Sequence, residues 1–267
     1  MKEQELMLTS ILDCRRVDLF TKKVNLSPFQ KSKFTKMKER RAKDEPLQYI
    51  IGFADFLDIK LFVDKRVLVP RPETEILVDL ILGDSHCDSH LKILDLGTGS
   101  GNIAIALAKN IKDCHVTSID VSIDAIELAK YNAKYNEVGG KIDFICEDLT
   151  RTLIDKVNRR AEFDIIVSNP PYVPTADLEN LPEDVKQEPM LALDGGEDGL
   201  DFYHEIIPAA AALLSDKGFL ALEIGDGQAE AIKEIAEQEF LSCEFTKDYV
   251  GTERVAVLRK KAKGKVR

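Results

Sequence analysis

A glycine-rich loop between a short apolar stretch and a helical segment constrains the fold more than any other feature of the chain. The run Asp95-Leu96-Gly97-Thr98-Gly99-Ser100-Gly101 ends an apolar stretch, and residues 102–110, which have helical spacing, follow directly. Glycines permit a tight turn and a close approach of a bound molecule, while the helix start presents unpaired N–H groups. This order predicts an α/β fold with a nucleotide-type site at the carboxyl edge of a parallel sheet.

Short apolar runs alternate with helical segments through the rest of the chain, as in a mostly parallel sheet that is covered on both faces. We expect strands near 92–96, 116–119, 142–146, 163–168 and 219–223, and a helix over 122–136. The last pair of runs, 241–249 and 254–258, has no helix between its members. It therefore predicts an antiparallel hairpin at one side of a Rossmann-like sheet.

The first 45 residues have a different pattern, with helical spacing over 2–14 and again over 27–41. Ser27-Pro28 is a typical helix start, with a capping residue before a first-turn proline. We therefore expect a small N-terminal helical domain over 1–45.

A stretch rich in β-favouring residues, 53–69, follows and predicts a β-hairpin with its turn at Asp64-Lys65. A helix is expected from Glu73, after Pro70-Arg71-Pro72 ends the strand. The predicted division is an N-terminal domain over 1–45, a hairpin linker over 46–72 and a large α/β domain over 73–267.

Charge and composition narrow the classes of function. The chain has 267 residues and a formal net charge of −10, which disfavours a protein that coats nucleic acid. No apolar run approaches the roughly 20 residues that span a bilayer, and the N-terminus does not resemble a signal peptide, so we expect a cytoplasmic protein without membrane contact. The five cysteines are scattered without a C-x-x-C pair, so no metal site is expected.

The loop differs from the dinucleotide fingerprint, because its glycines are spaced G-x-G-x-G and Asp95 precedes them. S-adenosylmethionine carries cationic sulfonium and ammonium groups, which suit a nearby carboxylate. Asp120 ends the next strand, where a carboxylate accepts hydrogen bonds from ribose hydroxyls. Asp148, which Leu149 follows, ends the third strand; it either faces the adenine or caps a helix, and the sequence leaves both open.

Asn169-Pro170-Pro171-Tyr172 follows the fourth expected strand and is the candidate catalytic segment. The prolines stiffen the loop and have no N–H, so the Asn169 side-chain oxygen and the Pro170 carbonyl can accept both hydrogens of an incoming –NH₂ group. Both oxygens would face the positive charge that develops on the attacking nitrogen. Tyr172 is expected to form a wall against a planar substrate amide. The alternative is an ordinary proline-bounded turn.

These motifs resemble the class I methyltransferase superfamily and its amino-methylating branch. Further segments resemble the PrmC/HemK family, and the similarity extends over about residues 46–258. The segments are Pro46-Leu47-Gln48-Tyr49-Ile50-Ile51-Gly52, Val67-Leu68-Val69-Pro70-Arg71-Pro72-Glu73-Thr74-Glu75, Glu188-Pro189 and Asp194-Gly195-Gly196-Glu197-Asp198-Gly199-Leu200. The resemblance implies a Rossmann-like class I methyltransferase. It would transfer a methyl group from S-adenosylmethionine to the side-chain nitrogen of glutamine in the Gly-Gly-Gln motif of class-1 release factors, leaving S-adenosylhomocysteine.

By position, the resemblance implies that the donor is bound by Gly97, Thr98, Gly99, Ser100, Gly101, Asp120, Asp148 and Leu149. Asp95, because of its charge, and Asn169 are further candidates for the donor site. The resemblance places the substrate glutamine against Asn169 to Tyr172, with Arg71 and Glu73 at the entrance, although a proline-led helix start explains those two equally well. The sequence departs from the family in its short N-terminal domain and in Leu149, which stands where an aromatic residue can occur.

Two other functions are compatible with the same motifs. An N6-adenine DNA methyltransferase would use the same pair of oxygens on a flipped base, but it needs a DNA-binding surface that this acidic chain does not suggest. A methyltransferase-like interaction module without activity is the other, and the intact motifs disfavour it. We therefore expect a monomeric enzyme with release factors as partners, without direct nucleic acid binding.

Overall fold

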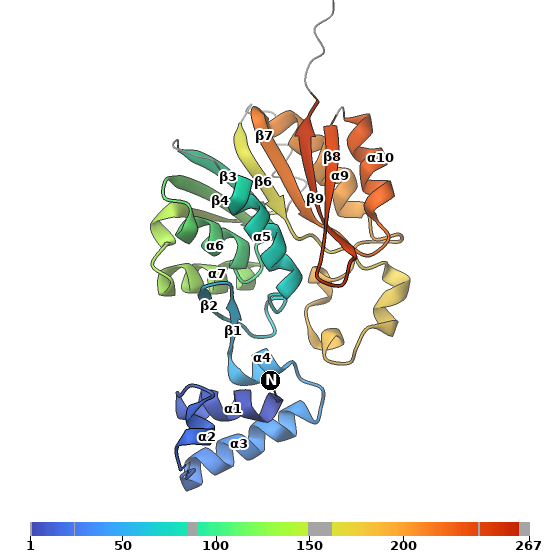
Figure 1. Cartoon of the computed structure of the whole chain (residues 1–267). Helices are drawn as coiled ribbons and strands as arrows, with labels where there is room; N and C mark the ends of the chain where they lie inside the picture. Colours follow the sequence, from blue (N-terminus) through green and yellow to red (C-terminus); the bar gives the residue numbers. More distant parts are fainter. Residues whose placement is uncertain (1, 24, 85–89, 149–161, 240, 262–267) are drawn as a thin grey trace, which may run out of the picture.

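The computed structural model describes residues 2–23, 25–84, 90–148, 162–239 and 241–261. Its centre is a seven-stranded sheet with the order β5-β4-β3-β6-β7-β9-β8 (Figure 1). The strands are β3 (Leu91–Leu96), β4 (Cys114–Asp120), β5 (Ile142–Cys146), β6 (Phe163–Ser168), β7 (Leu214–Glu223), β8 (Leu241–Lys247) and β9 (Glu253–Lys260). Strands β3, β4, β5, β6 and β7 are joined by parallel pairing, whereas β9 is antiparallel to both of its neighbours. The predicted fold, with its antiparallel hairpin at one side, is confirmed.

Helices cover both faces of the sheet (Figure 1). Helices α5 (Pro72–Asp84), α6 (Asn102–Asn110) and α7 (Ile123–Tyr135) pack on one face, in a core that includes Ile93. Helices α9 (Asp201–Leu213) and α10 (Ala229–Gln238) pack on the other face, in a core that includes Leu94. Neighbouring residues of β3 thus enter different cores, because successive side chains of a strand point to opposite faces. The shorter 3₁₀ segments are η1 (Gly139–Lys141), η2 (Thr175–Asn180), η3 (Val185–Gln187) and η4 (Met190–Ala192).

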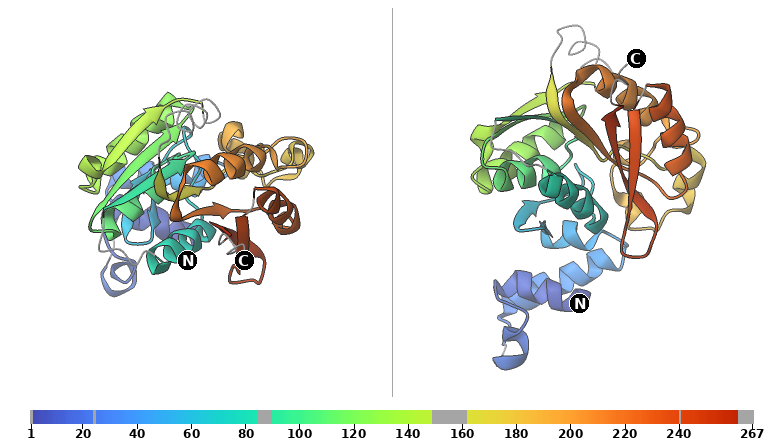
Figure 2. Two further views of the ribbon diagram at one scale, coloured as in Figure 1. Left: turned by 90° about the horizontal axis from the view of Figure 1, so that it is seen from above. Right: turned by 45° about the horizontal axis from the view of Figure 1, so that its top comes forward.

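The N-terminal helices form a separate cluster that projects from one end of the sheet domain (Figure 2). They are α1 (Glu3–Leu12), α2 (Asp18–Thr21), α3 (Pro28–Arg41) and α4 (Leu47–Ile51). The Ser27 hydroxyl accepts from Gln30 N, and the Gln30 side chain accepts from Ser27 N, which confirms the predicted helix start. Leu47 and Ile50 of α4 pack against Met7 and Met37, so the short helix shares the apolar core of the first 45 residues. The domain division remains a prediction.

The expected hairpin is present, but its turn was placed wrongly. Strands β1 (Phe53–Phe56) and β2 (Ile59–Phe62) join through Leu57 and Asp58, and Leu57 has a φ of 48°. The segment 63–69 does not pair as a strand. Val63, Val67 and Val69 are buried in the core beneath α5 instead, so their apolar character reflects burial and not pairing. Asp64 accepts hydrogen bonds from Arg66, which stabilises a bend within this segment.

No helix in the described part of the chain is long and apolar enough to cross a membrane.

Candidate active site

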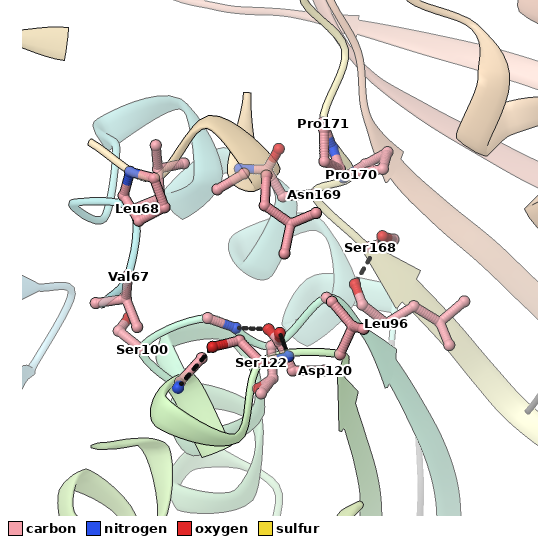
Figure 3. A pocket seen from close by; sticks show the side chains of 18 of the residues that line it. Val67, Leu68, Leu96, Ser100, Asp120, Ser122, Ser168, Asn169, Pro170 and Pro171 are labelled. Atoms are coloured by element: carbon pink, nitrogen blue, oxygen red, sulfur yellow. Dashed lines mark hydrogen bonds between the residues drawn. The ribbon is translucent and has the colours of Figure 1, made fainter. Parts of the chain in front are cut away.

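A cavity of about 250 Å³ opens at the carboxyl ends of β3, β4 and β6. Figure 3 shows Asn169, Pro170 and Pro171 across the cavity from Asp120 and Ser122, with Val67 and Leu68 along a third side. Two chain segments distant from these strands complete the lining. They are residues 66–71, before α5, and Pro189, Leu191 and Ala192 around η4. The predicted nucleotide-type edge therefore carries a real cavity.

Asp120 holds the glycine loop against the start of α7. Its Oδ2 accepts from Gly99 N at 2.8 Å and its Oδ1 accepts from Ser122 N at 2.9 Å (Figure 3). Burial raises the pKa of this carboxyl above its usual value, against the lowering effect of these N–H bonds. Each carboxylate oxygen has a second acceptor site. Asp120 can therefore support the loop and still accept a ligand hydroxyl.

The loop leaves room where a bound molecule would approach. Gly97 and Gly99 have φ values of 74° and 53°, and a Cβ on either residue would meet no heavy atom within 4 Å. The open backbone, the Asp120 carboxylate and the largely apolar walls together suit a nucleoside-containing methyl donor. Asp148 also lines the cavity. Leu149 lies outside the described residues.

Asp95 lies beneath the loop and is not among the residues that line the cavity. It is fully buried and accepts from the Ser118 hydroxyl at 2.8 Å, and that hydroxyl also lies 2.6 Å from Thr98 Oγ1. Burial raises the pKa of Asp95 to about 6. Asp95 thus lies behind the residues that line the cavity, and its other oxygen, Oδ1, is buried without a hydrogen-bond partner among the described residues. The direct contact with the methyl donor that the sequence suggested stays a prediction.

Gly101 also lies outside the cavity, and its role is to let α6 pack. It has a φ of 83°, and a Cβ there would lie 2.9 Å from Ile105 Cδ1 and 3.2 Å from Ala129 Cβ.

We expect Gly101→Ala to lower the free energy of unfolding by about 1–3 kcal/mol, because an alanine there would be strained by the left-handed backbone conformation and would also be crowded by its neighbours. Urea denaturation measures the change. Gly140→Ala is the matched control, since it has ordinary φ and open space, and an equal loss in both variants would contradict this explanation.

The Asn169 side chain is anchored on one side and open on the other. Its Nδ2 donates to Thr74 Oγ1 at 3.1 Å, and the residue lines the cavity. Among the described residues, no donor bonds to Asn169 Oδ1 or to the Pro170 carbonyl. Both oxygens are thus available to an incoming –NH₂ group.

Tyr172 is not among the residues that line the cavity, so its expected role as a wall against the substrate amide stays a prediction. Its hydroxyl points toward Glu223 Oε1 at 3.3 Å, and its carbonyl accepts from Gln228 Nε2 at 3.0 Å. The tyrosine ring instead belongs to the apolar packing around α9. Tyr172 is therefore linked to the buried Glu223 and not to the cavity surface.

Sequence reasoning missed Glu223 and Glu188 as parts of the site. Glu188 is buried; it accepts from Val69 N at 2.8 Å and pairs with Arg71 at 2.6 Å. It thereby joins the two distant segments of the cavity wall, and Arg71 lines the cavity as expected. Glu73 does not line it. A charged residue at the end of a buried strand was the available signal for Glu223.

Comparison with known proteins identifies two matching family models and several relatives. Residues 2–52 match the family model described as PrmC N-terminal domain, and residues 73–184 match Methyltransferase small domain. The solved structure of a SAM dependent methyltransferase from Agrobacterium tumefaciens has a TM-score of 0.54. It is 17% identical, and the alignment covers 78% of this chain and 70% of that one. The fold and the site together define a class I methyltransferase, for which S-adenosylmethionine is the methyl donor.

Sequence relatives specify the family. A release factor glutamine methyltransferase of Thermodesulfovibrio yellowstonii is 40% identical over 263 residues, which cover 97% of this chain and 92% of the relative. A protein with the same name from Geobacter sulfurreducens is 40% identical over 259 residues, covering 95% of this chain and 87% of the relative. The chain belongs to the release factor glutamine methyltransferase family.

Proposed function

We propose that this enzyme transfers a methyl group to the side-chain amide nitrogen of the glutamine in the Gly-Gly-Gln motif of class-1 release factors. The observation that carries the proposal is the state of Asn169, whose Nδ2 is bonded to Thr74 while its Oδ1 remains available at the cavity. An amide –NH₂ offers two donors to Asn169 Oδ1 and the Pro170 carbonyl.

S-adenosylmethionine, when bound, supplies an electrophilic methyl group on a sulfonium. Asp120, the 97–100 loop and Asp148 would hold it. An amide nitrogen is a poor nucleophile because its lone pair is delocalised. The two oxygens therefore have to orient that nitrogen and stabilise the positive charge that develops on it. Proline rings at 170 and 171 keep these acceptors in place, because they restrict the backbone.

The function is tested by incubating purified release factors with the enzyme and isotopically labelled methyl donor, followed by mass spectrometry of the Gly-Gly-Gln peptide. A methyl group on the glutamine nitrogen is expected. Duplex DNA in a parallel reaction tests the adenine alternative, which the named relatives do not support. Label in adenine and none in the release factor would refute the proposal.

The N-terminal helices are the part of the chain that we assign to docking the protein substrate, while residues 73–267 carry the chemistry. A single glutamine offers little surface, so selection among cellular glutamines requires contacts outside the cavity. Helix α3 offers a positively charged surface for docking, because four exposed lysines lie on this one helix of 14 residues. They are Lys31, Lys33, Lys36 and Lys38.

Reversal of these four lysines to glutamate is expected to lower kcat/KM for an intact release factor by about tenfold or more, because it removes electrostatic steering. Wild-type activity should also fall with added salt, since the attraction is screened. Initial rates with labelled methyl donor measure both effects.

The matched control reverses four other exposed lysines, Lys112, Lys130, Lys217 and Lys247, and so makes the same change in net charge. Calorimetry should show unchanged binding of the methyl donor in both variants. An equal loss of activity in the control, or none in the α3 variant, would remove the docking role from this helix.

A further inference from the structure

Behind the cavity, a buried chain of hydrogen bonds connects Asn169 to an acidic side chain that touches no substrate. Asn169 Nδ2 lies 3.1 Å from Thr74 Oγ1, and Thr74 Oγ1 lies 2.6 Å from Glu223 Oε2. Tyr172 completes the chain, with its hydroxyl 3.3 Å from Glu223 Oε1. Thr74 is 1% exposed and Glu223 is fully buried, so solvent does not reach the two central members of this chain of hydrogen bonds.

Three elements bring the chain together. In the β6–β7 pairing, Ser168 lies opposite Leu222, so Asn169 and Glu223 are the next residues of adjacent strands. Thr74 is in the first turn of α5, which packs on β7. The register of β6 and β7 and the position of α5 thus bring Asn169, Glu223 and Thr74 together.

The direction of these bonds follows from the chemistry of the groups. An ionised carboxylate can only accept, so the single hydroxyl hydrogen of Thr74 is donated to Glu223. Toward Asn169, Thr74 Oγ1 can then only accept a hydrogen bond. The group of Asn169 that contacts it must therefore be the –NH₂ group, which is a donor. The Asn169 oxygen is thereby turned toward the cavity. This reasoning holds without distinguishing the nitrogen and oxygen of the amide by position.

We infer that Glu223 and Thr74 are positioning residues that fix which end of the Asn169 amide faces the substrate. The inference rests on the proposed function, in which Asn169 Oδ1 accepts from the substrate amide. With Glu223 protonated, its own hydrogen can be donated to Thr74, and Thr74 is free to donate to Asn169 Oδ1. The amide then presents –NH₂ to the incoming –NH₂, so that two donors oppose each other.

The surroundings of Glu223 determine the pH at which it becomes protonated, and this pH lies in a range where activity can be measured. Burial raises its pKa to about 7, while the hydrogen bonds from Thr74 and Tyr172 and the positive charge of Arg254 act to lower it. Glu73 of α5 raises it further, and Tyr203 donates to the Glu223 main-chain oxygen. Glu223 is ionised above this pKa and protonated below it. The rate of methylation should therefore decline as the pH falls through about 7.

A pair of Thr74 variants tests the link. Thr74→Val keeps the shape but removes the hydroxyl, and we expect kcat to fall on the order of 10²-fold, as for other small displacements of a reacting group. Thr74→Ser restores a hydroxyl at the same place and should recover most of kcat. Calorimetric binding of S-adenosylmethionine should be unchanged in both variants, which also checks that they are folded.

Two further variants test the pH dependence of kcat. Glu223→Gln cannot ionise at this position. Its kcat should therefore lack the decline below about pH 7 that we expect for the wild type. Tyr172→Phe removes a donor that stabilises the ionised carboxylate, so the decline of kcat in this variant should begin at a higher pH. The inference would be overturned by any of three results. Thr74→Val could retain the kcat of the wild type, the kcat of the wild type could be independent of pH between about pH 6 and 8, or the decline at low pH could persist in Glu223→Gln. Retained turnover in Asn169→Ala would instead refute the role assigned to Asn169, whereas wild-type enzyme that leaves the release-factor glutamine unmethylated would refute the proposed function.

Discussion

Asn169→Ala should leave no measurable methyl transfer, a loss of at least on the order of 10²–10³-fold in kcat, by analogy with the removal of one preorganised group at a charged transition state. The alanine variant retains the Pro170 carbonyl but loses the oxygen that aligns the amide and stabilises its developing positive charge. S-adenosylmethionine should still bind with nearly the wild-type dissociation constant, because the loop and Asp120 are untouched. Single-turnover methylation and calorimetry measure the two quantities separately.

Asn180→Ala is the matched control, since Asn180 is an exposed asparagine in η2 away from the cavity. It should methylate at the wild-type rate. Turnover retained in the Asn169 variant would mean that another group holds the acceptor nitrogen. Equal loss of donor affinity and turnover would mean that Asn169 belongs to the donor site.

Asp120→Ala should have the opposite signature, with S-adenosylmethionine bound about 10- to 150-fold more weakly, or about 1.5–3 kcal/mol. The carboxylate is expected to accept from ribose hydroxyls, and it also holds Gly99 N and Ser122 N in the structure. At saturating donor the rate should recover in large part, because Asn169 remains in place. Calorimetry and the KM for the donor provide the test.

Asp124→Ala controls for the loss of a negative charge at the same end of α7, where Asp124 is exposed. Its donor affinity should stay within about twofold of wild type, as for surface changes within ±0.5 kcal/mol. Donor affinity unchanged in Asp120→Ala would show that the carboxylate only supports the loop.

Local patterns predicted much of the fold because the forces behind them are local. The glycine loop, the helix over 102–110 and the Ser27 cap are each specified within a few residues, and the structure contains all three. The hairpin turn was misplaced because β-favouring residues in 63–69 satisfy burial without pairing, and a single sequence does not separate those two causes.

The sequence predicted several residues that line the cavity, but not the contacts between them. Asp120 and Asn169 both line the cavity, and they could be singled out because Asp120 ends β4 and Asn169 directly follows β6 at one edge of the sheet. The Thr74–Glu223 link was missed because it joins residues 149 positions apart and requires the register of β6 and β7. Asp95 was expected beside the ligand, but it is fully buried and does not line the cavity, and sequence spacing does not show how deeply a side chain is buried.

The position of β3 between β4 and β6 has a consequence for folding. The donor side of the cavity comes from β3 and β4, whereas Asn169 follows β6, and the Ser168 hydroxyl reaches the Leu96 carbonyl across 72 residues. Such non-local pairing forms late and slowly. The cavity therefore exists only once the central strands have assembled, so its ligand binds the native state and not its precursors. Donor at 100 times its dissociation constant should add about 2.7 kcal/mol to the free energy of unfolding, which makes the melting temperature a direct readout of site occupancy.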